Sequence, residues 1–246
     1  MISSLKRLLP DSYAAGDALD FGDYVLRLKV NQRARRISLR IDNRTGEAVV
    51  TAPRAKHLKD AVDFARTRHD WILEHRRETS VPMPFAPGMV LSLRGHDVTL
   101  VHQAGVITPR AVQQPDGSWQ LQTSGDEATF ARRIHRYLKQ QAMKTVQAET
   151  DAYAARLGFS GVKVSLFDAR GRWGSCTPAR KAIRYSWRVI LAPRSVLSYL
   201  CAHEVAHLKH PDHSPRFWAE VTALYGDYKT ARTWLKTQGH ELFRYQ

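Results

Sequence analysis

The sequence predicts an α+β fold, with a β-rich N-terminal region followed by a mixed helical and β region. In the first half, short runs of alternating apolar and polar residues are separated by turn signals, which is typical of half-buried strands. From Glu127 onward, apolar residues recur at three- and four-residue spacings, which is typical of helices. We therefore predict a domain boundary near Gly125, with domains at residues 1–125 and 126–246.

The first elements predicted are a small antiparallel sheet and a helix that covers it. The turn signal Asn43-Arg44-Thr45-Gly46 separates the last two of three alternating segments, which are Tyr24–Val30, Ile37–Ile41 and Ala48–Thr51. The helix is expected at Leu58–Arg77, after Pro53, because its apolar residues recur at helical spacings.

A second β-rich stretch follows the prolines at positions 82, 84 and 87. We expect a hairpin over Val90–His102, turning near Arg94-Gly95, because glycine accepts the backbone angles of tight turns. A second strand pair, Ala111–Gln114 and Ser118–Gln122, flanks the turn at Pro115-Asp116-Gly117.

The second domain is predicted to alternate between helices and strands. A long helix reaches from Glu127 to about Leu157, with Phe130, Ile134 and Leu138 on its apolar side. The remaining elements follow in this order: a strand at Val162–Phe167, a turn at Arg172–Cys176, a strand at Ile183–Ile190, a helix from Pro193 to about Lys209, and helices starting at Pro215 and Asp227.

Composition indicates a folded, non-membrane protein. The chain has 246 residues, of which 43% are hydrophobic and 25% charged, close to the averages for globular domains. We expect a cytoplasmic location, because no apolar run is long enough to span a bilayer and the N-terminus lacks the apolar core of a secretory signal. The two cysteines, Cys176 and Cys201, are expected to be free thiols.

The formal net charge of +15 is large for this length. Such a charge favours polyanionic partners or substrates, so nucleic acid is a candidate partner, although a basic solvated surface explains the charge equally well.

The run His203-Glu204-Val205-Ala206-His207 carries the clearest chemistry in the sequence. On a helix, residues four apart lie on one face one turn apart, so the two imidazoles can share a metal ion. Glu204 lies one residue step around the helix, where it can act as a general base without occupying a ligand position. This pattern predicts a zinc site.

A catalytic zinc ion needs a third protein ligand, and two histidines follow the motif. His210 would share the face of His203 and His207 if the helix continued, but a residue before proline, here Pro211, is disfavoured in the α conformation. If the chain turns there, His213 can fold back toward the metal. We therefore favour His213, and keep His210 and Asp212 as alternatives.

Several residues near the motif are candidates for contacts with substrate or transition state. Arg184 and Arg188 would share one face of a strand and could bind phosphate or carboxylate groups, while solvent exposure is the simpler interpretation. Gly174 allows close backbone approach, in a turn whose role is either substrate contact or packing. The remaining candidates are Arg172 and Trp173 in this turn, and Tyr185 and Tyr199 as hydroxyl donors.

These motifs closely resemble the YgjP-like metallopeptidases, relatives of the SprT-type zincins. The similarity includes Arg172–Cys176, Tyr185–Ile190, Tyr199, His203–Leu208, His213-Ser214 and Phe217-Trp218, and, in the first half, Arg35–Arg40, Pro53, Trp71-Ile72 and Phe85–Gly88. The resemblance implies a zincin-like catalytic region with zinc on His203, His207 and His213 and with Glu204 as the catalytic base.

The predicted function is therefore a zinc-dependent hydrolase, foremost a metallopeptidase that acts on polypeptides through a Glu-activated, metal-bound water. The first alternative is a metal-dependent nucleoside triphosphate pyrophosphatase, because such an activity has been attributed to a member of the family that the chain resembles. The second is a nucleic-acid-binding protein with a structural zinc, which would have four protein ligands.

Overall fold

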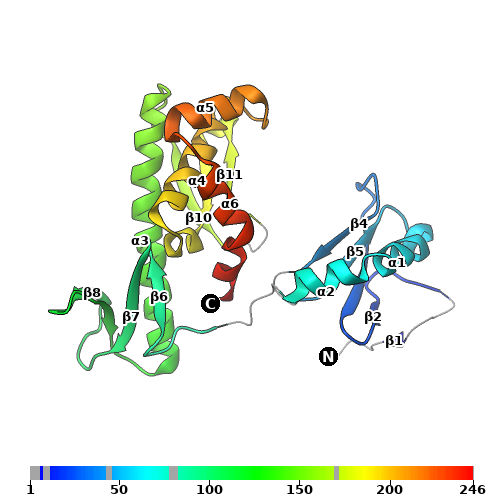
Figure 1. The fold of residues 1–246 in the computed structure, drawn as a ribbon, viewed down its shortest axis with the longest axis horizontal. Coiled ribbons are helices and arrows are strands. Elements are labelled where there is room, and N and C mark those ends of the chain that lie inside the picture. The colour runs from blue at the N-terminus through cyan, green and yellow to red at the C-terminus, as the bar shows by residue number, and fades with distance from the viewer. Residues whose placement is uncertain (1–5, 8–11, 43–45, 78–82, 169–171, 246) are drawn as a thin grey trace. The chain divides into compact units, whose positions relative to one another are not determined.

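The computed structural model describes residues 6–7, 12–42, 46–77, 83–168 and 172–245. They form two compact units, Met1–Ser80 and Val81–Gln246 (Figure 1). Each unit has its own hydrophobic core. Helices and strands are mixed in both units, which confirms the α+β prediction.

The first unit contains a five-stranded sheet in the order β1-β2-β3-β5-β4. Its strands are β1 (Lys6–Arg7), β2 (Ala18–Asp20), β3 (Val25–Val30), β4 (Ser38–Ile41) and β5 (Ala48–Ala52). The predicted antiparallel sheet is wrong in one respect, because β3 pairs with β5 in parallel and β4 lies outside them at the edge. Burial explains the arrangement, since Ala48, Val50 and Ala52 are fully buried and β5 is therefore held in the interior.

Two helices cover this sheet where one was predicted. A short 3-10 turn, η1 (Ala55–His57), leads into α1 (Leu58–Arg66), and α2 (His69–Arg77) follows. The break falls at Thr67, whose hydroxyl donates a hydrogen bond to the Phe64 carbonyl at 2.8 Å and so competes with the helical pattern.

The second unit begins with a four-stranded sheet in the order β6-β7-β9-β8. Its strands are β6 (Val90–Leu93), β7 (His96–His102), β8 (Arg110–Gln113) and β9 (Trp119–Thr123), which form the two predicted hairpins. Leu100 and Leu121 of this sheet share one core with Phe130 and Ile134 of the following helix, α3 (Glu127–Arg156). The predicted boundary near Gly125 is therefore wrong, because it would divide a continuous core.

The two sheets share a topology that the sequence did not reveal. In β2 to β5 of the first sheet and in β6 to β9 of the second, the first two of the four strands form an antiparallel pair, the second pairs in parallel with the fourth, and the third pairs antiparallel with the fourth at an edge. A helical segment follows the fourth strand in both cases. The strands β2 to β5 and β6 to β9 are thus two copies of one arrangement.

The rest of the second unit packs against α3. A three-stranded sheet has the order β10-β12-β11, with β10 at Lys163–Phe167, β11 at Gly174–Thr177 and β12 at Ala182–Ser186. The helices of this part are the 3-10 helices η2 (Pro178–Arg180), η3 (Trp187–Leu191) and η4 (Gly239–Arg244) and the α-helices α4 (Arg194–Ala206), α5 (Pro215–Tyr225) and α6 (Lys229–Thr237). The strand predicted to reach Ile190 ends at Ser186, because the fully buried run Trp187–Leu191 forms a 3-10 helix and a continuous apolar run has no distinctive period. In the described part of the chain, no helix is long and apolar enough to cross a membrane.

Candidate metal centre

The last turn of α4 carries His203 and Glu204, and His207 is its C-cap residue. Leu197, Leu200 and Val205 anchor this helix in the core. After Ala206 the turns tighten, since Leu208 N–H and Lys209 N–H donate to carbonyls three residues back, at 2.9 and 3.1 Å. The helix therefore ends three residues before the predicted Lys209.

His213 is held by the start of α5. The Asp212 carboxylate accepts a hydrogen bond from Ser214 N–H at 3.4 Å, and the Ser214 hydroxyl caps the helix by accepting one from Phe217 N–H at 3.5 Å. Pro215 occupies the first turn, where its fixed φ favours helix initiation. These caps place His213 directly before a rigid helix.

The three histidines His203, His207 and His213 converge. One ring nitrogen from each lies within 4.8 Å of the others, and Nε2 of His213 is 3.3 Å from Nε2 of His203. Two nitrogens bound to zinc at about 2.05 Å with a tetrahedral angle are about 3.3 Å apart. The group therefore fits a zinc ion.

Hydrogen bonds and packing orient these rings. Nδ1 of His207 is 3.0 Å from the His210 carbonyl, so its N–H points away from the group and leaves Nε2 as the ligand atom. Nδ1 of His203 is 3.5 Å from the Tyr199 hydroxyl. Phe217 packs against all three rings, with centroid separations of 4.4 to 4.9 Å.

Burial favours the neutral form of the His203 and His207 imidazoles, which is the form that binds metal. It lowers the pKa of His203 to about 3, and the neighbouring His207 and His213 act in the same direction. Burial also lowers the pKa of His207, against the opposing effect of its hydrogen bond to the His210 carbonyl.

Glu204 is buried beside the histidines, with 5% of its surface exposed. Burial raises the pKa of its carboxyl to about 8, although the positive charge of Arg172 opposes this shift. Its Oε2 has no hydrogen-bond partner among the described residues. A Cβ at Gly174 would lie only 2.7 Å from Glu204 Cγ, so the glycine of β11 makes room for this side chain, as the close-approach interpretation predicted.

His210 and Asp212, the alternative ligands, lie outside the histidine group. The His210 ring is 3.5 Å from a carboxylate oxygen of Glu220, and only its backbone carbonyl contacts His207. Asp212 accepts its hydrogen bond from Ser214. The chain turn at Pro211 thus brings His213 to the group and directs His210 elsewhere.

Two of the predicted contact residues, Tyr199 and Arg172, interact with the centre, and Arg184 shares a contact with Arg172 on Phe167. Tyr199 is 3% exposed and contacts His203, which makes it an orienting partner of that ring. The guanidinium groups of Arg172 and Arg184 lie 5.6 and 5.3 Å from the centroid of Phe167. Both arginine residues are exposed.

The other three predicted contact residues are structural. Tyr185 is fully buried and its hydroxyl lies 2.9 Å from that of Thr150. Arg188 is 1% exposed and lies in η3, so it does not share a strand face with Arg184 as predicted. Trp173 stacks on Phe243 of the C-terminal turn at 4.6 Å. Burial leaves the side chains of Tyr185 and Arg188 unavailable to a substrate, and the partly buried Trp173 packs on the C-terminal turn.

The cysteines are free thiols, as predicted. Burial and the nearby Glu204 raise the pKa of Cys176 to about 12, and burial raises that of Cys201 further. Neither thiol is a ready nucleophile, because the thiolate is the reactive form.

Two residues near the centre carried no signal in the sequence. Tyr228 stacks on Trp218 at 4.9 Å, and the guanidinium of Arg232 lies 4.5 Å from the Trp218 ring. Trp218 in turn packs against His203 and His213, both at 5.8 Å.

A model of the YgjP-like metallopeptidase domain matches residues 35–238. The chain belongs to this family. Membership identifies it as a metallohydrolase of the YgjP-like type and makes a metal cofactor an expected component of the histidine site. No curated protein matches the chain.

Two solved structures are similar to part of this YgjP-like chain. One is the metallopeptidase zymogen of Pyrococcus abyssi abylysin, with 25% identity, a TM-score of 0.34, and coverage of 38% of this chain and 95% of the other. The other is the metallopeptidase zymogen of Methanocaldococcus jannaschii jannalysin, with 17% identity, a TM-score of 0.33, and coverage of 37% and 91%.

Proposed function

We propose that this protein is a zinc-dependent peptidase in which His203, His207 and His213 hold one zinc ion and Glu204 is the general base. The convergence of the three imidazoles is the observation that carries the proposal, because the 3.3 Å between Nε2 of His203 and Nε2 of His213 matches two nitrogens on a tetrahedral zinc ion and the third ligand atom lies within 4.8 Å of both. The polypeptide substrate is inferred from family membership.

A bound zinc ion would lower the pKa of a coordinated water toward about 7 and polarise the bond under attack. Glu204 then takes a proton from the attacking water and passes it to the leaving amine. Its burial and its contact with Gly174 hold the carboxylate in one place, and its unpartnered Oε2 is available to accept the proton. Tyr199 and the His210 carbonyl keep the imidazoles oriented.

The substitution Glu204→Gln tests this proposal in the full-length protein. It removes the proton acceptor and preserves size, so cleavage of an unstructured polypeptide should fall by at least about 100-fold while zinc content stays unchanged. Glu220→Gln is the matched control, because Glu220 pairs with Lys209 at 2.8 Å and is not in the histidine group. Full activity in Glu204→Gln would contradict the role of Glu204.

A second candidate function is hydrolysis of nucleoside triphosphates at the same site. Arg172 and Arg184 favour it, because their guanidinium groups both lie beside Phe167 and the charge of Arg172 acts on Glu204. Guanidinium groups bind phosphates well. Release of pyrophosphate from UTP, abolished by Glu204→Gln and reduced by Arg172→Gln with Arg184→Gln, would establish this function in place of peptide hydrolysis.

A nucleic-acid-binding protein with a structural zinc is less well supported. It requires a fourth protein ligand, and the candidates for that position, His210 and Asp212, contact Glu220 and Ser214 instead.

A further inference from the structure

A groove beside α3 lies outside the candidate metal centre. Its narrower part has a volume of about 240 Å³ and is formed by α3 and the sheet of β6 to β9, and its wider part, of about 510 Å³, is formed by α3 and the segment 107–109. Tyr137 and Gln141 line both parts, which are therefore adjacent and are here together called the α3 groove. It shares no lining residue with the histidine group.

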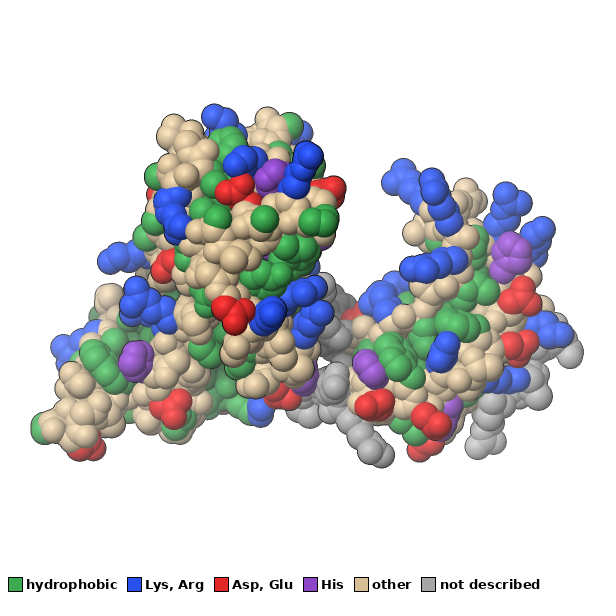
Figure 2. All heavy atoms as spheres, turned by 45° about the horizontal axis from the view of Figure 1, so that its top comes forward, with side chains coloured by type: hydrophobic (Ala, Val, Ile, Leu, Met, Phe, Trp, Pro, Cys, Tyr) green, Lys and Arg blue, Asp and Glu red, His purple; other side chains and the backbone are tan. Residues whose placement is uncertain are grey.

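The α3 groove is strongly basic. Between Ala128 and Ala148, α3 contains no acidic residue and five basic ones, which are Arg132, Arg133, Arg136, Lys139 and Lys144. Arg132 and Arg136 are exposed one helical turn apart, so their charges lie on the same face. They also line a further hollow of about 390 Å³, together with Lys139. Figure 2 shows Lys and Arg side chains spread over the face of the molecule that it draws.

These arginines differ in what they can bind. Arg133 donates to the carbonyl and the hydroxyl of Ser124, at 2.8 and 3.1 Å, and so helps to form the wall. Arg132 donates one hydrogen bond to the Thr129 hydroxyl at 3.1 Å, which leaves its other N–H groups available. Arg132 and Arg136 are therefore the natural contacts for an anion.

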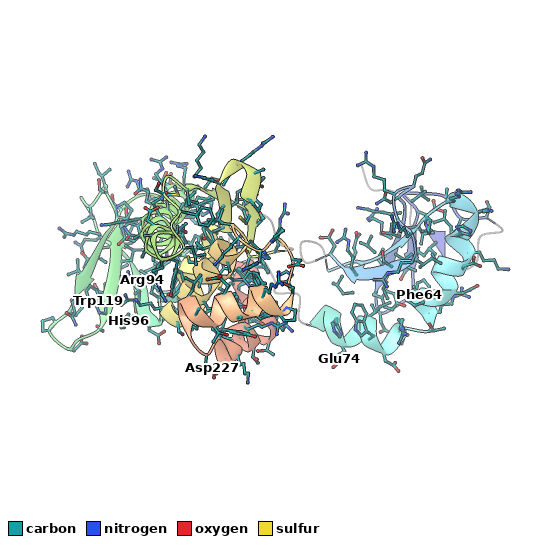
Figure 3. The ribbon with its side chains drawn as sticks, turned by 90° about the horizontal axis from the view of Figure 1, so that it is seen from above. Phe64, Glu74, Arg94, His96, Trp119 and Asp227 are labelled. Atoms are coloured by element: carbon teal, nitrogen blue, oxygen red, sulfur yellow. The ribbon has the colours of Figure 1, made fainter. Side chains whose placement is uncertain are left out.

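The narrower part of the groove adds aromatic surface. Trp119 is the first residue of β9 and lies on the same face of the strand as the buried Leu121. Trp119 itself is only partly buried, and its exposed part lines the groove. Arg94 and His96 of the β6–β7 hairpin lie close to it, on the sheet beside α3 (Figure 3). Arg94 has a positive φ of 54°, in the turn that the hairpin requires.

We propose that the α3 groove binds single-stranded nucleic acid, with phosphates on Arg132 and Arg136 and a base stacked on Trp119. Basic residues that follow a backbone, combined with aromatic side chains that stack on bases, are the two requirements for binding single strands. A duplex hides the faces of its bases, and an acidic peptide has no base to stack on Trp119. The site is independent of the reaction catalysed at the metal centre.

Fluorescence anisotropy with a labelled oligothymidylate of about 20 nucleotides tests the proposal in the full-length protein. Replacing both Arg132 and Arg136 by Gln should weaken binding and reduce the slope of log K against log salt by about 1.4, because each phosphate contact with a single strand contributes about 0.7. Trp119→Ala should weaken binding about 5- to 150-fold, the range expected for one stacked base, and Trp119→Phe should retain most of it.

The matched control replaces Lys229 and Lys236 by Gln, which removes the same charge from exposed positions on α6. Three outcomes would overturn the proposal: equal loss of binding in this control, equal affinity for a duplex of the same length, or equally effective competition by polyglutamate. Circular dichroism of each variant separates loss of binding from loss of folding. If Trp119→Ala fails to fold, the double variant with Gln at positions 132 and 136, which are exposed, still provides the test.

Discussion

Gly174 lies directly against Glu204, and this position should be intolerant of any side chain. Its φ lies outside the left-handed region, so alanine suits the backbone and only the added Cβ is in conflict with Glu204. We expect Gly174→Ala to displace the carboxylate, to lower the free energy of unfolding by about 1–3 kcal/mol, and to reduce hydrolysis with zinc retained. Thermal unfolding, zinc analysis and an activity assay measure the three effects.

The neighbouring Ser175→Ala provides the control, because it shortens a partly buried side chain in the same strand without adding atoms near Glu204. Comparable losses of activity in the two variants would show that β11 is sensitive as a whole and that the Gly174 contact has no special role.

His210 and His213 should differ sharply in their effect on zinc. His213→Ala removes a proposed ligand and should weaken zinc binding by more than about 100-fold. His210→Ala should change it by less than about tenfold, because His207 contacts the backbone carbonyl of His210, which the substitution keeps. Competition with a chelating dye gives both affinities, and the opposite order would identify His210 as the third ligand.

Local spacing made part of the candidate site predictable. His203, Glu204 and His207 are related by one helical turn, and Pro211 indicated that His213 would replace His210. The sequence did not show that the side chains of Tyr185 and Arg188 are buried, because their hydrogen-bond partners are distant in the chain. Thr150 lies 35 residues from Tyr185, and Tyr245 lies 57 residues from Arg188. Alternation along a strand gives the face of a residue, but not what covers that face.

At the level of elements, η3 and η4 are joined by a buried arginine. Arg188 donates through Nε and Nη2 to the Tyr245 carbonyl, at 3.1 and 3.0 Å, and through Nη1 to Asp168. Its guanidinium also lies over the rings of Trp187 and Phe243, at 4.5 and 6.0 Å. These contacts fix the C-terminal turn to η3 within the second unit.

Arg188→Leu should therefore destabilise the second unit by about 2–4 kcal/mol, because the Tyr245 carbonyl loses its donors and a cavity replaces part of the side chain. Arg184→Leu is the control: the side chain is exposed, so the same substitution should change stability by less than about 0.5 kcal/mol. Urea unfolding followed by tryptophan fluorescence gives both values. Equal destabilisation would contradict the importance of the buried contacts.

The repeated strand arrangement explains why elements were easier to predict than their pairing. Alternating patterns located β3, β4 and β5, as well as both later hairpins. The parallel pairs β3 with β5 and β7 with β9 each skip an intervening strand, and no local pattern encodes that choice. Burial of β5 and β9 inside their sheets decides the pairing, and this burial depends on the helix that follows each of these strands.

For the whole molecule, the positions of the hydrophobic cores, and not the change from strands to helices near Gly125, determine where one unit ends and the next begins. That change from β to α is real, but Leu100 and Leu121 before it share a core with Phe130 and Ile134 after it. The first unit has a separate core around Leu26, Val50, Leu58, Val62 and Ile72. Secondary structure alone could not reveal this, because a sheet and the next helix form one core or two depending on their packing.

Separate cores predict that the second unit folds alone. A fragment of residues 83–246 keeps the hydrogen bond from Met83 N–H to the Arg244 carbonyl, at 2.7 Å, and the fully buried Phe85. It should unfold cooperatively, bind zinc and match one thermal transition of the full chain. A fragment of residues 90–246 loses the contacts of Phe85 with Trp187 and Tyr245 and should be less stable by about 3–5 kcal/mol. Calorimetry distinguishes the cases: if the longer fragment lacks a cooperative transition, the two units depend on each other for folding.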